Sequence, residues 1–154
     1  MSTISAREPS KGFPFSNPWD IADGITTEAA TGTPYFYFTD MEMSVIDLNA
    51  DNRLSISVTL NQGGYCKDQG MGAQDPPCGR VILTGSSVKL EDGSVEAEFA
   101  KETLFAKHPS MPYWPQDHGF YFAKMNVEHV ILLAGFGGAI EVPIEDYFAA
   151  SLTD

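Results

Sequence analysis

The chain has 154 residues, which suffices for one domain with a sizeable core but not for two independent cores. Its 9 Lys and Arg against 21 Asp and Glu give a formal net charge of −12, which argues against direct binding to nucleic acid or to anionic membrane surfaces. No apolar run approaches the roughly 20 residues of a membrane-spanning helix, so we expect no membrane insertion.

Residues 1–33 are rich in Pro, Gly, Ser and Thr, and we expect them to form an irregular N-terminal arm on a single domain spanning residues 1–154. The first dozen residues lack the apolar core of a secretory signal. Either the protein works inside the cell or a signal was removed upstream of Met1, and the sequence leaves both open.

After the arm, two strand patterns enclose a helix pattern. Four consecutive aromatics at residues 35–38 favour a strand that is covered on both faces. Residues 41–50 carry apolar side chains near the helical period and predict a short helix. Residues 53–60 alternate between aliphatic and polar side chains, most of them hydroxyl-bearing, which predicts a strand with one polar face.

A longer strand is expected over residues 80–90, before an Asp-Gly turn signal. The next residue, Ser94, resembles a helix cap, but a capping box requires Glu or Gln where Ala97 stands. Because residues 95–99 alternate between apolar and acidic side chains, we expect a strand that folds back as a hairpin.

The last third of the chain is expected to begin with a short helix over residues 100–108, ended by Pro109. Two strands, residues 120–127 and 129–142, should follow, joined tightly around residues 126–128. A final helix is expected to start at Pro143, where acidic side chains occupy the first turn.

A glycine-rich strip, Gly135 to Gly138, interrupts the last of these strands. A dinucleotide-binding loop would need a further glycine where Ile140 stands, so we interpret the strip as a bend or bulge inside a strand. Because strands outnumber helices and neighbouring strands can pair as hairpins, we predict a mostly antiparallel β-barrel with a few short helices, an α+β fold.

Few residues of the sequence suggest a catalytic or ligand-binding site. Cys66 and Cys78 lie in a segment of loop formers, and their spacing permits either a disulfide or two reduced thiols. The three histidines are scattered without a ligand motif, so no metal site is expected. No serine lies in a GxSxG turn, which disfavours a hydrolase.

Several longer segments resemble one family. They are "GTPYFYFTDMEMSV", "LSISVTLNQGGYC", "DPPC", "ILTGSSVK", "LFAKHPSMPYWPQDHGFYFAKMNVEHVILLAGFGG" and "PIEDYF", spread over about residues 32–148. The combination resembles the CREG proteins, described as cellular repressors of genes stimulated by an adenoviral early protein. The resemblance implies the antiparallel split β-barrel of the FMN-binding pyridoxamine phosphate oxidases, and a homodimer.

Related oxidases hold FMN in two grooves at the dimer interface, whereas a loop is thought to fill the groove in animal CREG proteins. These are regarded as non-catalytic, secreted or endolysosomal glycoproteins that regulate growth and differentiation through protein partners. The resemblance therefore implies a non-catalytic regulatory or binding protein without cofactor, whose pocket is filled by the 66–78 loop. The plug we predict is Gly72, Ala73, Gln74 and Asp75, and the resemblance favours a disulfide between the flanking cysteines.

An FMN-binding oxidoreductase, with the loop standing aside, is the alternative. Flavin phosphate requires Arg or Lys with hydroxyls; the candidates are Arg53, Ser57, Thr59, Arg80 and Lys124, with Lys89 also beside a predicted strand.

Haem binding is a third reading, because the "GFGG" strip resembles haem-handling split barrels. Those barrels tend to have a basic residue where this chain has Gly138. The chain also has no Asn-x-Ser/Thr acceptor for N-glycans, which departs from the family's secretory pattern and leaves a cytoplasmic location open.

Overall fold

A computed structural model describes residues 1–26 and 29–150. Within these residues seven strands form one antiparallel sheet, in the order β2-β1-β4-β5-β6-β3 with β7 also paired to β6. The strands are β1 (Ser2–Ile4), β2 (Pro14–Ser16), β3 (Tyr35–Phe38), β4 (Arg53–Thr59), β5 (Arg80–Lys89), β6 (Tyr121–Leu133) and β7 (Ile140–Val142). The predicted class, mostly antiparallel β-structure with short helices, is confirmed.

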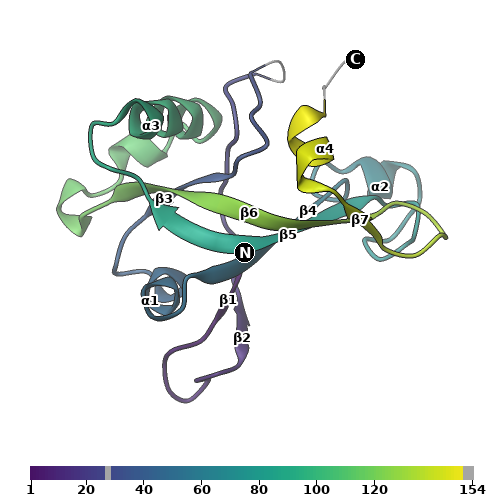
Figure 1. Ribbon diagram of the computed structural model, residues 1–154, viewed down its shortest axis with the longest axis horizontal. Helices are drawn as coiled ribbons and strands as arrows, with labels where there is room; N and C mark the ends of the chain where they lie inside the picture. Colours follow the sequence, from purple (N-terminus) through teal and green to yellow (C-terminus); the bar gives the residue numbers. More distant parts are fainter. Residues whose placement is uncertain (27–28, 151–154) are drawn as a thin grey trace.

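Short helices flank the sheet. They are α1 (Met43–Ala50), α2 (Tyr65–Asp68), α3 (Val95–Lys107) and α4 (Ile144–Ala149), with 3-10 turns at Met111–Tyr113 and Gln116–His118. Figure 1 shows β5 and β6 as the long central strands, with α3 toward one end of them and α2 toward the other. In the part of the chain that the structure describes, no helix is both long and apolar enough to cross a membrane.

The four aromatics of β3 are all buried, as the sequence predicts, because each face of the strand meets its own core. Phe36 and Phe38 belong to a cluster with aliphatic residues of α1, β4, β5 and β6. Tyr35 and Tyr37 point the other way, into a cluster with Ala97, Ala100 and Leu104 of α3. We call the face that carries Tyr35 and Tyr37 the outer face.

The N-terminal arm is more ordered than its composition predicts, because β1 and β2 pair as a hairpin and β1 extends the sheet beside β4. Asp47 of α1 holds this hairpin from a fully buried position. Its carboxylate accepts hydrogen bonds from Thr3 Oγ1 (3.2 Å), Ala6 N (2.9 Å), and Arg7 Nε and Nη2 (3.0 and 2.9 Å). Burial opposes ionisation, but these donors outweigh it and hold the pKa of Asp47 below its ordinary value.

The predicted strand over residues 95–99 is wrong, since these residues form the first turns of α3. Ser94 caps the helix by accepting a hydrogen bond from Ala97 N at 3.1 Å, without the Glu or Gln of a capping box. Val95, which the alternating pattern places inside a sheet, is 90% exposed. Five alternating residues are too few to outweigh a capped amphipathic helix.

The predicted junction at residues 126–128 is also wrong, because β6 runs through it without a turn. The register shifts there instead: Thr84 pairs with His129 and Gly85 with Val127, so Glu128 is an extra residue in a β-bulge. Gly85 permits the bulge, since a Cβ at this position would collide with the carbonyl oxygen of Asn126. The polar residues at 126–128, which suggest a turn in the sequence, therefore lie in a bulge.

The glycine strip joins β6 to β7 as a turn, so the bend lies between two strands and not inside one. Gly135 and Gly138 adopt φ values of 128° and 89°, which favour glycine over other residues.

Candidate functional site

The candidate site is the part of the outer face formed by β4, β5 and β6. Residues directly opposite one another in an antiparallel sheet point to the same side. The register therefore stacks three rows across the strands on this face, namely Ser55, Thr84 and His129; Ser57, Ile82 and Ile131; and Thr59, Arg80 and Leu133. We call these nine residues the outer strip.

The middle of the outer strip is aliphatic and is not covered by a helix. Ile82, Ile131 and Leu133 belong to neither hydrophobic cluster of the fold and remain partly exposed. Farther along the same face, α3 packs on Tyr35 and Tyr37. The outer strip thus has partly exposed aliphatic side chains on β5 and β6 beside a column of hydroxyls on β4.

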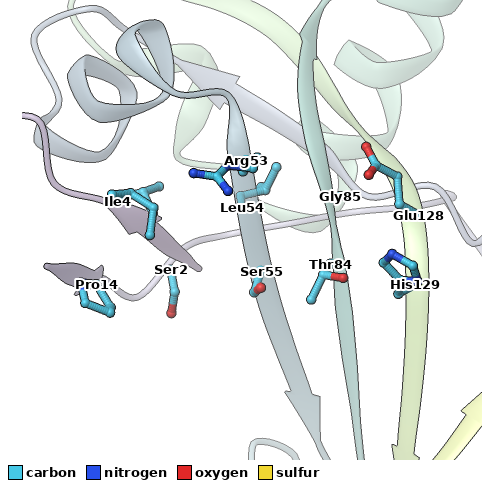
Figure 2. Close-up of a pocket in the computed structure, with 11 residues that line it drawn as sticks. Ser2, Ile4, Pro14, Arg53, Leu54, Ser55, Thr84, Gly85, Glu128 and His129 are labelled. Atoms are coloured by element: carbon cyan, nitrogen blue, oxygen red, sulfur yellow. The ribbon is translucent and has the colours of Figure 1, made fainter. Parts of the chain in front are cut away.

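A groove of about 410 Å³ crosses one end of the outer strip. Figure 2 shows Ser2 of β1, Ser55 of β4, Thr84 of β5 and His129 of β6 side by side across its floor. The hydroxyl row continues onto β2, where Ser16 Oγ lies 2.9 Å from Ser2 Oγ. The groove therefore presents hydroxyl donors and acceptors on three neighbouring strands, β1, β4 and β5.

The bulge in β6 gives this end of the strip two titratable side chains. Val127 and Val130 point inward, so the extra residue leaves both Glu128 and His129 on the outer side, where they line the groove (Figure 2). Glu128 Oε1 accepts a hydrogen bond from Ser86 Oγ at 3.0 Å. His129 Nδ1 lies 3.9 Å from a carboxylate oxygen of Glu141. The sequence prediction missed this pair because it expected a turn here.

Arg80 lies at the other end of the outer strip. Its Nη1 is buried and has no hydrogen-bond partner among residues 1–26 and 29–150, and no ion pair of Arg80 occurs within the same ranges. A buried guanidinium nitrogen without an acceptor is unfavourable. Arg80 is therefore the group on this face that most clearly lacks a partner within the described chain.

The other predicted phosphate ligands are distributed over the sheet. Thr59 is the direct cross-strand neighbour of Arg80, and Ser57 lies in the next row on the same face. Arg53 lines the groove instead, and its Nη2 pairs with Asp51 at 2.6 Å; hydrogen bonds from Arg53 lower the pKa of Asp51 to about 2. Lys124 is bound to both carboxylate oxygens of Glu96 at 2.8 and 2.9 Å.

The remaining cation beside a strand, Lys89, lies over the ring of Tyr121 at 4.1 Å. Of the predicted set, the structure thus brings together Arg80, Thr59 and Ser57, and separates Arg53 and Lys124 from them.

The predicted pocket-filling loop connects β4 to β5 at the Arg80 end of the strip. In the structure Cys66 and Cys78 are fully buried and joined by a disulfide with a Cα–Cα distance of 5.5 Å. Gly135 N donates to Pro76 O at 2.7 Å, which ties the loop to the turn after β6. Residues 72–75 are exposed and do not line the groove of Figure 2.

A cavity of about 200 Å³ is bordered by Trp19 and Trp114, and two larger cavities lie elsewhere. One, of about 350 Å³, is mostly aliphatic and is bordered by Val58 of β4 and Tyr147 of α4. The other, of about 460 Å³, lies beneath α3 between Tyr37, Phe105 and Phe122. Neither includes a residue of the predicted phosphate-binding set.

The chemistry of the outer strip suits binding. Within the described ranges, no three His, Cys, Asp or Glu side chains gather as metal ligands, and no hydrogen bond joins His129 to a hydroxyl of the groove. Hydroxyls, an apolar centre and one unpaired guanidinium are features of a recognition surface.

Comparisons with solved structures show the fold. The heme binding protein from Mycobacterium smegmatis is similar with a TM-score of 0.74 at 19% identity, over 97% of this chain and 54% of that chain. A Clostridium acetobutylicum protein related to general stress protein 26, of the pyridoxinephosphate oxidase family, is similar with a TM-score of 0.55 at 14% identity, over 95% of this chain and 84% of that chain. At these identities the likeness concerns the split-barrel architecture alone.

Sequence comparison is more specific. The chain is 42% identical to Protein CREG1 of Gallus gallus over 96% of its own length and 77% of the relative's. It is 36% identical to Protein CREG2 of Mus musculus, over 98% of this chain and 51% of the relative. The family model described as "CREG, beta-barrel" matches residues 1–149. The chain belongs to the CREG β-barrel family.

Proposed function

We propose that this chain is a non-catalytic regulatory or binding protein that works as a homodimer, with the outer strip as its dimer face. The observation that carries the proposal is the aliphatic part of the strip, Ile82, Ile131 and Leu133, which belongs to neither core cluster and lies beside the hydroxyls of β4 and beside Arg80. Burial of such a face against a second copy removes apolar surface from water.

In this proposal the 66–78 loop fills the pocket that related barrels use for FMN, with Gly72, Ala73, Gln74 and Asp75 as the plug. Two contacts support this assignment: the disulfide at the base of the loop, and the bond from Gly135 N to Pro76 O. Both keep the loop beside the Arg80 end of the dimer face. In a face-to-face dimer, the outer strip of the second chain would therefore lie against the plug of the first.

The proposed regulatory role runs through a protein partner, since a formal charge of −12 opposes direct contact with DNA. A secreted or endolysosomal location is part of the proposal. The buried disulfide supports it, because disulfides persist in oxidising compartments.

FMN binding is the second candidate, and the unpaired Nη1 of Arg80 beside Thr59 and Ser57 favours it. These residues would hold the flavin phosphate, and the flavin would supply redox chemistry. The fit is partial, because Arg53 and Lys124 are engaged with acids elsewhere and leave one guanidinium for a dianion. Haem has less support, since Gly138 offers no side chain to a propionate or to iron.

Sedimentation over a range of protein concentrations, combined with FMN titration, tests both readings. We expect a dimer that does not quench flavin fluorescence. A variant that lacks residues 72–75 but keeps both cysteines should bind FMN more tightly than the wild type, and Arg80→Ala in that variant should abolish the gain. A monomeric wild type would overturn the dimer proposal. Tight FMN binding by the wild type would overturn the filled pocket and favour the flavin reading.

A further inference from the structure

Few charged groups lie on or beside the outer strip. Arg80 occupies one outer row, and Glu128 lies beside the His129 row at the other end. Arg53 lines the groove at that end too but is engaged with Asp51, and Glu141 of β7 lies beside Ile131 in the middle row. Along β5, Arg80 and Thr84 lie two residues on either side of Ile82. The strip therefore has a cation and a carboxylate on opposite sides of an apolar centre.

Two copies that pack face to face through this strip are related by a two-fold axis between the sheets. If the axis runs along the strands, each row meets the same row of the other copy, and the two Arg80 side chains approach one another. If it runs across the strands over the Ser57–Ile82–Ile131 row, the Arg80 row of each copy lies over the Thr84–His129 row of the other. Only the second arrangement brings opposite charges together.

We infer that Arg80 pairs with the partner subunit's Glu128 across the dimer interface, so that the two-fold axis crosses the strands at Ile82. This inference rests on the proposed homodimer and adds its orientation and its charged contact. Stacked sheets lie about 10 Å apart, a gap that extended Arg and Glu side chains bridge from both sides.

The pairing answers two unfavourable features of the single chain. The Arg80 side chain has no ion pair within residues 1–26 and 29–150, and the partner subunit's Glu128 would provide one. Copies with a formal charge of −12 repel one another, and two such contacts per dimer place a cation against an acid at each end of the interface. Glu128 is free to turn toward a partner, because it is exposed and its hydrogen bond within the described chain is with the hydroxyl of Ser86.

A charge exchange between two chains tests the inference. One chain carries Arg80→Glu and therefore has acids at both positions; the other carries Glu128→Arg and has cations at both. Each variant alone should dimerise at least about tenfold more weakly than the wild type, in line with close interfacial charge pairs. Mixed together, they should form a heterodimer, since both contacts are then between opposite charges.

Differently tagged variants, native mass spectrometry and sedimentation at low and high salt provide the measurements, and circular dichroism verifies that each variant is folded. Glu91→Arg, an exposed site outside the strip, is the control for the change in net charge. It should leave dimerisation within about twofold of the wild type, as expected for an exposed charge away from the contact.

The outcomes separate the two proposals. A monomeric wild type removes both the homodimer and the charged contact. A dimeric wild type whose two variants show no preference for each other leaves the homodimer and overturns the Arg80–Glu128 contact. Should Arg80→Glu fail to fold, the variants Arg80→Gln and Glu128→Gln give the same comparison without charge repulsion. If the contact exists, each of these two substitutions weakens the dimer, and their combined effect on the dimerisation free energy is non-additive.

Discussion

At its β3 end the outer face of the sheet is covered by α3, whereas over β4 and β5 the same face is bare. Tyr37 lies under the helix with its ring stacked on Phe120 and Phe122, at centroid distances of 4.6 and 4.9 Å. Ile82, on the same face, belongs to no cluster of the fold. The covered region completes its core within one chain, and the bare region has apolar surface that residues 1–26 and 29–150 leave partly exposed.

The largest contrast is expected between Tyr37→Ala and Ile82→Ala. Truncation of the buried ring should lower the free energy of unfolding by about 3–5 kcal/mol, because the cavity is enclosed by aromatic neighbours. Truncation of Ile82 should lower the stability of dilute, monomeric protein by less than about 1 kcal/mol, since its surroundings are open. Urea denaturation at low protein concentration gives both values. Equal losses would mean that the two regions are buried alike.

Loss of the disulfide should act on the bare region. The double substitution Cys66→Ser and Cys78→Ser frees the connection between β4 and β5, and should lower the free energy of unfolding by about 3 kcal/mol through chain entropy. Hydrogen exchange should increase at residues 60–80 and stay unchanged in α3. Reduction of the wild type should reproduce the shift in Tm; a Tm that ignores reductant would show that the loop does not depend on the bond.

The β1-β2 hairpin borders the bare region and depends on one carboxylate. Asp47→Asn should lower stability by about 2–3 kcal/mol, because Arg7 and two other donors lose an ionised acceptor. Hydrogen exchange should rise at residues 2–16.

The same carboxylate sets a pH dependence. Since its pKa is lower in the folded protein than in the unfolded chain, its contribution is fully present above about pH 4 and is lost as the pH falls through the folded-state pKa. Acid titration of stability should therefore be flatter in Asp47→Asn than in the wild type. An equal acid sensitivity of both proteins would contradict the role of Asp47.

A small effect is expected at the start of the covering helix. Ser94→Ala removes the acceptor for Ala97 N and should lower stability by about 1 kcal/mol. Ser94→Asp, which keeps an acceptor, is the matched control and should retain wild-type stability. If both variants lose the same amount, the cap does not hold α3 in place.

Patterns that report burial directly were sufficient for much of the fold. The aromatic run of β3, the alternation of β4 and the length of β5 are local signals, and all three strands form as predicted. The first turns of α3 were predicted as a strand, because the same residues carry a five-residue alternation and a helix cap that lacks the Glu of a capping box. No local signal separates a bulge from a turn at residues 126–128, since the difference lies in pairing with Gly85, which is distant in the sequence.

The candidate site, like the fold, could be predicted only in part from the sequence. Residue chemistry was enough to single out Arg80, Thr59 and Ser57, which the structure places on one face. It could not reveal that Lys124 is engaged by Glu96, nor that His129 and Glu128 join the strip, because these depend on side-chain partners and on the register of strands far apart in the chain.

The inserted Glu128 also acts as a phase change along β6. Before it, the even-numbered residues Lys124 and Asn126 face outward; after it, the odd-numbered His129, Ile131 and Leu133 do so. A deletion of this single residue would restore regular alternation along the strand and leave the same side chains on each face, with Val127 and Val130 to the core and His129 and Ile131 to the outer side. The extra residue thus adds a carboxylate to the exterior of the sheet without exchanging the two faces of the strand.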